Sequence, residues 1–347
     1  MDMNIQQEGT YGHPEPGRID RDSLLRYLGH RIPAIIGRPA AITGIQRKRS
    51  EYSSSYDADI ITVQLNTDEE LKIYAKNFGV TRFPKDDLKQ RRDRELSVYR
   101  DLLVETDLGT AKYYGSVWDE SQGTFWCFLE FVAGSEVGAC GLEYWAAAAG
   151  WLGRLQSCFA QQANRLRACD FLVRHDASFF RLKADLAVRE VLPNSAPLAR
   201  RLAHVLDRYD RLVQVLASQP HTLVHGSYRP ANVIVDVNSE PMRICPIDWE
   251  MAAYGSALYD LAYLSEGLRQ PTLDWLLEAY RQEAMADDVA VPDIEEIRHV
   301  VTCFHFFMKI HLLSRARARN LSETKVAATV ERLEQLHPVV FGSAIHV

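Results

Sequence analysis

The first third of the chain alternates hydrophobic and polar residues in several short segments. Residues 59–65 read Asp-Ile-Ile-Thr-Val-Gln-Leu, and residues 71–76 read Leu-Lys-Ile-Tyr-Ala-Lys. Alternation with a period of two residues is typical of a β-strand that buries one face. Segments 41–45, 112–117 and 124–131 also have the character of strands. The pattern therefore predicts an antiparallel sheet in this part of the chain.

Helical periodicity dominates the rest of the chain. Between two of the strands, residues 86–104 place Leu96, Tyr99 and Leu103 at spacings that share one helix face. Gly134 then breaks the strand pattern. Beyond it, the expected helices cover 142–168, 180–188, 197–218, 257–267, 272–285, 293–319 and 322–335.

A tail and a short helix are expected before the sheet. Residues 1–19 are polar and rich in proline and glycine, as in a poorly ordered N-terminal tail. The helix is expected to begin at Asp22 or Ser23 and to end near Gly29 and Pro33.

Residues 222–250 interrupt the helical region. Apolar runs at 223–224 and 244–247 flank a polar stretch, and Asn238-Ser239 inside it favours a turn. This pattern predicts a β-hairpin embedded among helices.

These elements divide the chain into three parts. We expect the tail and short helix in 1–35, a β-rich lobe in 36–130 and a mainly helical lobe in 131–347. The length of 347 residues suits two domains, and the class is α+β. Small-molecule sites favour a cleft between two such lobes.

Composition narrows the classes of partner. Lys and Arg total 40 against 46 Asp and Glu, and a formal net charge of −6 argues against sequence-independent nucleic-acid binding. No apolar run approaches the ~18 residues of a membrane span, and no apolar segment near the N-terminus indicates a secretory signal. Six dispersed cysteines without a CxxC pair are typical of free thiols. We therefore expect a cytoplasmic protein with no membrane or nucleic-acid partner; the sequence does not indicate its oligomeric state.

Two polar segments adjoin the expected hairpin. Residues 225–232 read His-Gly-Ser-Tyr-Arg-Pro-Ala-Asn, and residues 247–250 read Ile-Asp-Trp-Glu. Asn232 and Asp248 are 16 residues apart, which suits a strand, a turn and a second strand. A hairpin would bring their side chains to the same end of neighbouring strands. Amide and carboxylate oxygens are ligands that suit Mg²⁺ together with water and phosphate.

These two segments resemble the catalytic and metal-binding motifs of the aminoglycoside phosphotransferase family, which comprises small-molecule kinases with a protein-kinase-like fold. The resemblance covers roughly residues 40–335 and is most specific in these paired loops. It implies a two-lobed fold, with a small antiparallel β-sheet N-lobe and a larger, mainly helical C-lobe, that uses ATP or GTP with Mg²⁺.

The resemblance also implies roles for individual residues of the two loops. His225 takes the position of the loop histidine, and Arg229 that of a cation near the transferred phosphate. Asn232 and Asp248 take the positions of the two metal ligands. Asp260, in Leu-Tyr-Asp-Leu-Ala, resembles the buried carboxylate that braces the catalytic loop. Taken singly, each of these residues also has an ordinary structural role open to it: His225 in bonds within the loop, Arg229 in a surface ion pair.

The N-lobe residues match the family less specifically. Residues 71–76 resemble the strand whose lysine holds the nucleotide phosphates, and Lys76 fits that role better than Lys72. Choosing Lys72 would place Glu70 against the adenine, whereas for Lys76 that position is taken by Tyr74, which can stack. Glu95 is the expected partner of Lys76.

Two further nucleotide contacts follow from the same resemblance. The polar link Ser53, Ser54 and Ser55 would cover the phosphates through backbone N–H groups and hydroxyls, or would simply be a hairpin loop. The segment that contains Glu130 and Val132 resembles the hinge whose backbone binds the base.

One departure from the family concerns the catalytic base. The family's aspartate, which accepts the acceptor hydroxyl's proton, is Ser227 here. A positioned base typically contributes ~10²–10⁴-fold, whereas most acceleration of phosphoryl transfer comes from positioning and from stabilised charge. The resemblance therefore implies a slowed phosphotransferase that moves the γ-phosphoryl group of ATP or GTP to a hydroxyl of a small polar molecule. The acceptor would lie near Glu250 and the 257–319 helices.

Two alternatives remain open at this stage. A catalytically impaired pseudokinase would bind nucleotide or metabolite and regulate a partner, and Ser227 motivates this reading. In a third alternative, the nucleotide is used in another orientation and a different group is transferred, which would yield an adenylylated product. Other site patterns, namely GxSxG, HExxH and a GxGxxG turn, do not occur. The basic run at 315–319 is expected on the surface of a helix near its C-terminus.

Overall fold

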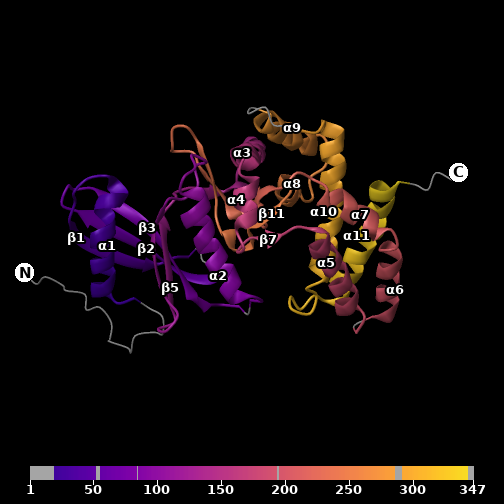
Figure 1. Cartoon of the computed structure of the whole chain (residues 1–347), viewed down its shortest axis with the longest axis horizontal. Helices are drawn as coiled ribbons and strands as arrows, with labels where there is room; N and C mark the ends of the chain where they lie inside the picture. The colour runs from indigo at the N-terminus through magenta and orange to yellow at the C-terminus, as the bar shows by residue number, and fades with distance from the viewer. Residues whose placement is uncertain (1–18, 52–54, 84, 194, 286–290, 343–347) are drawn as a thin grey trace, which may run out of the picture. The chain divides into compact units, whose positions relative to one another are not determined.

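The computed structural model of the chain describes residues 19–51, 55–83, 85–193, 195–285 and 291–342. The chain forms two compact units. The first unit takes the chain up to Leu88 and again from Ala111 to Phe131. The second takes Lys89–Thr110 and the chain from Val132 onward. Figure 1 labels many of the elements of both units.

The first unit is built on a five-stranded antiparallel sheet. Its strands lie in the order β1-β2-β3-β5-β4, and every neighbouring pair is antiparallel. The bounds are β1 Ile42–Arg49, β2 Tyr56–Leu65, β3 Glu70–Thr81, β4 Tyr113–Asp119 and β5 Thr124–Glu130. All five strands expected from the alternating pattern are therefore confirmed.

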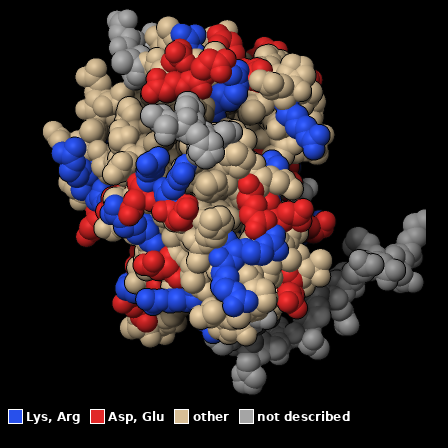
Figure 2. All heavy atoms as spheres, turned by 90° about the vertical axis from the view of Figure 1, so that its right-hand side faces the viewer, with Lys and Arg blue, Asp and Glu red and all other residues tan. Residues whose placement is uncertain are grey.

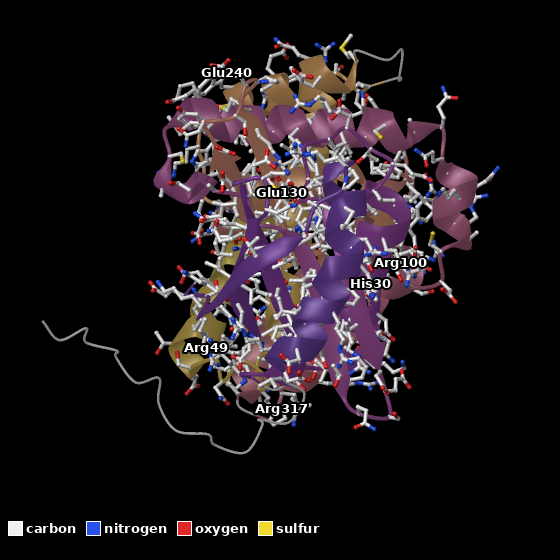
Figure 3. All side chains as sticks on the ribbon, turned by 90° about the vertical axis from the view of Figure 1, so that its left-hand side faces the viewer. His30, Arg49, Arg100, Glu130, Glu240 and Arg317 are labelled. Atoms are coloured by element: carbon white, nitrogen blue, oxygen red, sulfur yellow. The ribbon has the colours of Figure 1, made fainter. Side chains whose placement is uncertain are left out.

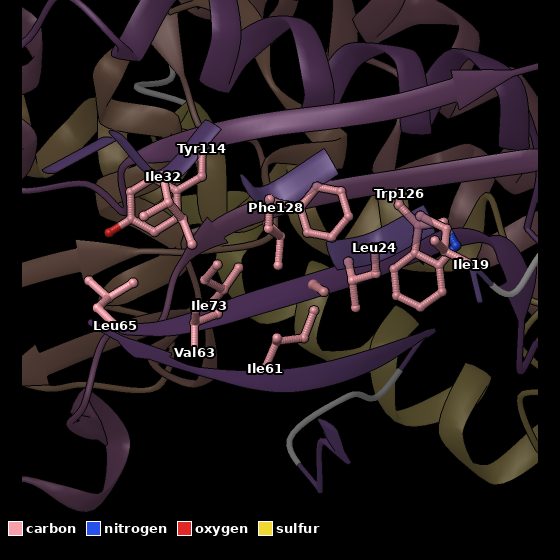
Figure 4. Packing of buried hydrophobic residues seen from close by; sticks show 12 residues of the cluster. Ile19, Leu24, Ile32, Ile61, Val63, Leu65, Ile73, Tyr114, Trp126 and Phe128 are labelled. Carbon is pink, nitrogen blue, oxygen red and sulfur yellow. The ribbon is translucent and has the colours of Figure 1, made fainter. Parts of the chain in front are cut away.

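The helix α1 (Arg21–Ile36) packs on this sheet and completes its core. Leu24, Leu28 and Ile32 follow one another at four-residue intervals, so they share one face of the helix, and all three are buried. They pack against strand residues of the sheet that include Ile61 and Phe128, as Figure 4 shows. The alternating strands and the helical stripe thus bury their apolar faces against each other.

Both ends of α1 differ from the prediction. The N-cap is Asp20, whose side chain accepts a hydrogen bond from the backbone N–H of Ser23. The helix continues through Pro33 and ends at Gly37, which has a φ of 72°. A proline inside a helix costs about 3 kcal/mol in a lost hydrogen bond and a clash. Burial of Ile32 beside it offsets this cost because a fully buried Ile contributes about 1.5–3 kcal/mol.

The segment after the third strand belongs to the second unit, although the prediction assigned it to the β-rich lobe. It forms α2 (Leu88–Ser97), followed by a π-helical turn at Val98–Leu103. Arg94 donates to the carbonyl oxygens of Phe171 and Glu250 at 2.7 and 2.5 Å. Trp151 donates through its indole N–H to the Leu108 carbonyl at 2.6 Å. These long-range bonds tie the segment to the helical unit.

The second unit is mainly helical, as predicted. Its helices are α3 Leu142–Ala160, α4 Ala163–Ala168, α5 Ala177–Val191, α6 Ala196–Val205, α7 Tyr209–Ala217, α8 Ala257–Leu264, α9 Thr272–Ala284, α10 Ile294–Leu313 and α11 Glu323–Phe341. Two expected helices, 142–168 and 197–218, are each divided into a pair. The expected helix 293–319 ends early, at Leu313, where the Ser314 hydroxyl donates to the His311 carbonyl at 2.8 Å. That bond satisfies a carbonyl that a further helical turn would have used.

Short strands within the second unit form two three-stranded sheets. One has the order β10-β9-β6 and the other β7-β11-β8. The bounds are β6 Ser135–Glu136, β7 Val173–Arg174, β8 Thr222–Val224, β9 Val233–Asp236, β10 Arg243–Pro246 and β11 Ala253–Gly255. Strands β9 and β10 pair antiparallel, which confirms the hairpin expected in 222–250. Asp236 stabilises its turn by accepting from the Asn238 N–H and the Ser239 hydroxyl.

All six cysteines are free thiols, as expected. In the part of the chain that the structure describes, none of the helices combines the length and the apolar character needed to span a bilayer.

The packing of α1 on the sheet leads to a first prediction. We expect Leu28→Ala to lower the free energy of unfolding by about 2–5 kcal/mol, because it leaves a cavity in the core of the first unit. His30→Ala on the exposed side of the same helix, labelled in Figure 3, serves as the matched control. Urea unfolding of both variants measures the difference; equal stability would contradict the packing of α1 on the sheet.

Candidate active site

The hairpin brings the two expected metal ligands to the same end of neighbouring strands. Asn232 directly precedes β9 and Asp248 is the second residue after β10, while Val233 and Pro246 are paired across the hairpin. The backbone N–H of Ile247 donates to the carbonyl of Asn232 at 2.9 Å. The arrangement inferred from the 16-residue spacing is therefore the one that the structure has.

The side chain of Asn232 is oriented by the catalytic-type loop. Its Nδ2 donates to the carbonyl oxygen of Ser227 at 2.9 Å and lies 3.4 Å from the Ser227 hydroxyl oxygen. Because the amide nitrogen faces the loop, the amide oxygen is the atom turned to other ligands. An amide oxygen is the end of Asn that a metal ion uses.

Asp248 has a backbone conformation that is rare for a residue with a side chain. Its φ and ψ are 68° and 60°, in the left-handed region, at the start of the 3-10 turn Trp249–Met251. A non-glycine residue there costs about 1–3 kcal/mol and persists only where its surroundings hold it. Trp249 holds this turn: its ring is fully buried, and its indole N–H donates to the Pro246 carbonyl at 3.3 Å.

A buried carboxylate holds the loop at His225 and Gly226. The two oxygens of Asp260, in α8, accept hydrogen bonds from the backbone N–H groups of His225 and Gly226 at 2.6 and 3.0 Å. Asp260 is fully buried. Burial raises the pKa of its carboxyl to about 7, and the backbone N–H groups of His225, Gly226 and Tyr228 oppose that rise. These are the contacts that a bracing role requires.

His225 is itself bonded within the loop. Its Nε2 lies 2.8 Å from the carbonyl oxygen of Ile247, and its Nδ1 accepts from the backbone N–H of Ser227 at 3.3 Å. The ring is completely buried and packs 4.6 Å from the ring of Trp249. With both ring nitrogens engaged, His225 links the loop to the end of β10.

Arg229 lies beside a cavity of the second unit. The cavity has a volume of about 300 Å³ and is lined by the loop residues Arg229 and Pro230 and by residues of α8, α10 and the segment that follows α10. The guanidinium of Arg229 lies 5.5 Å from the ring centre of Tyr263, which also lines the cavity.

Glu250 is paired with another side chain of the protein. It is buried, and its carboxylate forms an ion pair with Arg91 of α2 at 3.1 Å. The residues that line the cavity do not include it. The expectation that Glu250 contacts an acceptor thus gains no support from its surroundings, which are those of a structural ion pair.

In the first unit, Lys76 and Lys72 have different environments. Lys76 is 8% exposed and lies about 5 Å from the ring centres of Tyr56 and Phe78. Lys72 is exposed and pairs with Glu70 at 3.4 Å. A lysine held in a pocket of aromatic rings is the better candidate for a ligand contact, in line with the choice made from the sequence.

The other expected nucleotide contacts are placed as follows. Ser53 and Ser54 fall outside the described residues, and Ser55 lies just before β2. Glu95 is buried in α2, in the second unit. Glu130, labelled in Figure 3, ends β5, and its carboxylate accepts from the backbone N–H of Lys112 at 3.1 Å. Val132 is buried two residues later.

Within the described ranges, no group of three or more His, Cys, Asp and Glu side chains could hold a metal ion by itself. A two-ligand set of Asn232 and Asp248 fits Mg²⁺, which keeps waters and is usually bound through one or two carboxylates and the phosphates of a substrate.

Sequence reasoning misplaced part of the basic run at 315–319. Arg315 and Arg319 line the cavity instead of covering a helix surface, whereas Arg317 points away and is paired with Glu190. Lys309 of α10 also lines the cavity and was not singled out. The four-residue interval between Arg315 and Arg319 was the available signal, because residues at that interval share one side of a helical turn.

Comparison with known proteins assigns the chain to a family, because the family model matches most of the chain. The model of a family described as "Phosphotransferase enzyme family" matches residues 53–296. A search of curated proteins finds no match.

Solved structures show the same fold at low sequence identity. The GDP complex of wild-type aminoglycoside 2'-phosphotransferase-IIIa is 18% identical, with 91% of this chain and 99% of that chain covered and a TM-score of 0.55. A macrolide 2'-phosphotransferase from Brachybacterium faecium is 14% identical over 90% and 98% of the two chains, with a TM-score of 0.56. A microcompartment-associated aminopropanol kinase is 14% identical over 86% and 91%, with a TM-score of 0.55. The kinase-like α+β fold expected from the sequence is thereby confirmed.

The loop geometry leads to a second prediction, at Gly226. This residue has a φ of 79°, and a Cβ atom there would lie 2.0 Å from the carbonyl oxygen of Met251. Gly267 has a φ of 87°, and a Cβ there would meet nothing within 4 Å. We expect Gly267→Ala to cost about 1–2 kcal/mol of backbone strain and Gly226→Ala about 2–5 kcal/mol, since a clash is added. Thermal melting of both variants measures this, and equal shifts would contradict the close approach of the loop to Met251.

Proposed function

Because the chain belongs to the phosphotransferase enzyme family, we propose that it transfers the γ-phosphoryl group of ATP or GTP to a hydroxyl of a small polar molecule. The observation that carries the proposal is the convergence of Asn232 and Asp248 at one end of the hairpin, beside the loop that Asp260 braces. Fold neighbours whose names describe phosphotransferases and kinases of small molecules, one of them a GDP complex, support it.

The metal ligands in this proposal are the amide oxygen of Asn232 and the carboxylate of Asp248. Mg²⁺ bound there would neutralise charge on the phosphate oxygens. The hydrogen bond from Asn232 Nδ2 to the Ser227 carbonyl leaves the amide oxygen as the atom that would hold the ion. The left-handed backbone of Asp248, fixed by buried Trp249, sets the direction of its carboxylate.

The nucleotide contacts in this proposal come from the first unit and from α2. Lys76 binds the phosphates, and Glu95 orients Lys76. The backbone of Glu130 and Val132 binds the base. Burial of Lys76 among aromatic rings supports its role, because a charge held out of water interacts more strongly with phosphate.

The reaction itself is a substitution at the γ-phosphorus. The acceptor oxygen forms a new bond to phosphorus as the bond to the β,γ-bridging oxygen breaks, and the nucleoside diphosphate leaves. Arg229 offsets the charge on the transferred group. Ser227 has no carboxylate to take the hydroxyl proton, so the proton passes late to an oxygen of the transferred phosphoryl group. This route fits a loose transition state in which the proton is lost late, and it predicts slow turnover.

The second candidate function is a pseudokinase that binds nucleotide or metabolite and regulates a partner. Ser227 favours this function because the loop lacks the carboxylate base, although Asp260, His225 and Asn232 still hold the loop in place. The two candidate functions differ in whether the chain transfers a phosphoryl group at all.

A third prediction concerns Asp248. Asp248→Asn is expected to abolish Mg²⁺-dependent nucleotide binding while leaving the fold intact, because Asn also tolerates the left-handed backbone. In the unaltered chain, MgATP or MgGTP at about 100 times its Kd should add about 2.7 kcal/mol to the free energy of unfolding. Thermal melting with and without MgATP measures the loss.

The exposed Asp170, changed to Asn, serves as the matched control in the same unit and should keep the full nucleotide-dependent shift. A shift that survives in Asp248→Asn would sink the proposed metal site.

A fourth prediction concerns the missing base. We expect Ser227→Asp to raise phosphoryl turnover by about 10²-fold or more, since a positioned carboxylate base typically contributes ~10²–10⁴-fold. Ser195→Asp adds the same charge at the N-cap of α6, where Asp is a good cap, and should leave turnover unchanged. Coupled detection of the nucleoside diphosphate measures both. Turnover absent in the unaltered chain but present in Ser227→Asp would favour the pseudokinase.

A further inference from the structure

The charged side chains that line the cavity beside Arg229 are mostly cationic. Four cationic side chains line it, from Arg229, Lys309, Arg315 and Arg319, against one carboxylate, from Glu266. Glu266 is itself ion-paired with Lys309, so the remaining excess is positive. Within the described part of the chain, neither Arg229 nor Arg319 forms an ion pair with a carboxylate.

The cations come from segments far apart in sequence. Arg229 belongs to the catalytic-type loop and Lys309 to α10, whereas Arg315 and Arg319 follow the end of α10. Partial burial and then the positive charges of Arg315 and Arg229 lower the pKa of Arg319, so both guanidinium groups act electrostatically on Arg319. Bringing like charges together is unfavourable unless an anion compensates them.

The fifth basic group of the cavity stays neutral. Burial, and then the charges of Lys183 and Arg315, lower the pKa of His311 well below its usual value. The cavity thus combines cations at its wall with a neutral imidazole and the aromatic ring of Tyr263. Figure 2 shows a face of the second unit on which acidic and basic side chains are interspersed. The predominantly cationic lining of the cavity differs from that ordinary surface.

The neighbouring cation within the basic run follows the ordinary pattern. Arg317 lies between Arg315 and Arg319, is 61% exposed and binds Glu190 through its guanidinium. The run therefore separates into one exposed arginine, Arg317, and two arginines that line the cavity.

We infer that this cavity binds the anionic group of the acceptor, and that the acceptor is a small alcohol carrying a carboxylate or a phosphate. The inference rests on the proposed function and names the substrate class of that same site. Guanidinium groups bind carboxylate and phosphate in bidentate geometry, whereas a polycation would be repelled by the same lining. Arg229 follows Ser227 by two residues, so an acceptor held here has its hydroxyl near the loop.

The size of the cavity limits the acceptor. Ligand pockets usually range from about 300 to 1,000 Å³, and this one, at about 300 Å³, is at the lower end. A compact acceptor of a few carbon atoms fits such a volume.

The test compares matched three-carbon probes by calorimetric titration of the full chain without nucleotide. Glycerate and glycerol phosphate carry the two anionic groups, glycerol is the uncharged counterpart, and kanamycin is a polycation. We expect at least one anionic probe to bind at least about tenfold more tightly than glycerol, and kanamycin not to bind.

Arg319→Gln is expected to weaken binding of the anionic probe by about tenfold or more, since it removes one charged hydrogen-bond donor group. Arg317→Gln, with the same change outside the cavity, should leave that affinity within about twofold. Arg315→Gln serves as a second cavity variant if melting shows that Arg319→Gln does not fold. Tighter binding of kanamycin or equal binding of glycerol would overturn the inference, as would unchanged affinity in the cavity variants or displacement of the anion by MgATP.

Failure of the proposed function gives a different result. An anionic probe that binds in the cavity and yields no phosphorylated product with MgATP would count against phosphoryl transfer and leave the anion site standing. Phosphorylation of kanamycin would support phosphoryl transfer and overturn the anionic acceptor.

Discussion

The candidate site depends on one buried carboxylate. Asp260 receives the backbone N–H groups of two successive loop residues, His225 and Gly226, on its two oxygens. Both donors would be costly to bury unpaired, and the carboxylate would be costly to bury without them. Glycine is required at position 226, because the loop passes against the Met251 carbonyl with a positive φ. The hydrogen bonds to Asp260 fix the path of the loop, and with it the direction of the side chains that follow.

The hairpin extends that order to the two proposed metal ligands. Strands β9 and β10 bring Asn232 and Asp248 to one end, and the bond from Ile247 to the Asn232 carbonyl closes that end. Each ligand is then set by a separate device: Asn232 by its bond to Ser227, and Asp248 by the strained turn that Trp249 anchors. Strain of this kind persists only where packing over-determines it, and buried Trp249 provides that packing here.

Ser227 and the cationic cavity fit one chemical picture. Ser227 removes a negative charge from the loop, and the cavity next to Arg229 collects cations. Both changes make the surroundings of the acceptor more positive. Such surroundings suit an acceptor that brings its own negative charge, because cations attract an anion and repel a cation. Glu250, the carboxylate that the sequence offered for acceptor binding, is instead neutralised by Arg91.

The sequence by itself determined the elements whose signal is local. Local strand patterns predicted the five strands of the first sheet, and the spacing of Asn232 and Asp248 predicted the hairpin between them. Tertiary structure decided what depends on distant partners. Helix α1 runs through Pro33 because Ile32 is buried on the sheet, and segment 89–110 joins the helical unit because its polar groups bond there. Arg315 and Arg319 meet Arg229 only once α10 is packed, since a local window records periodicity but not which distant segment a side chain will face.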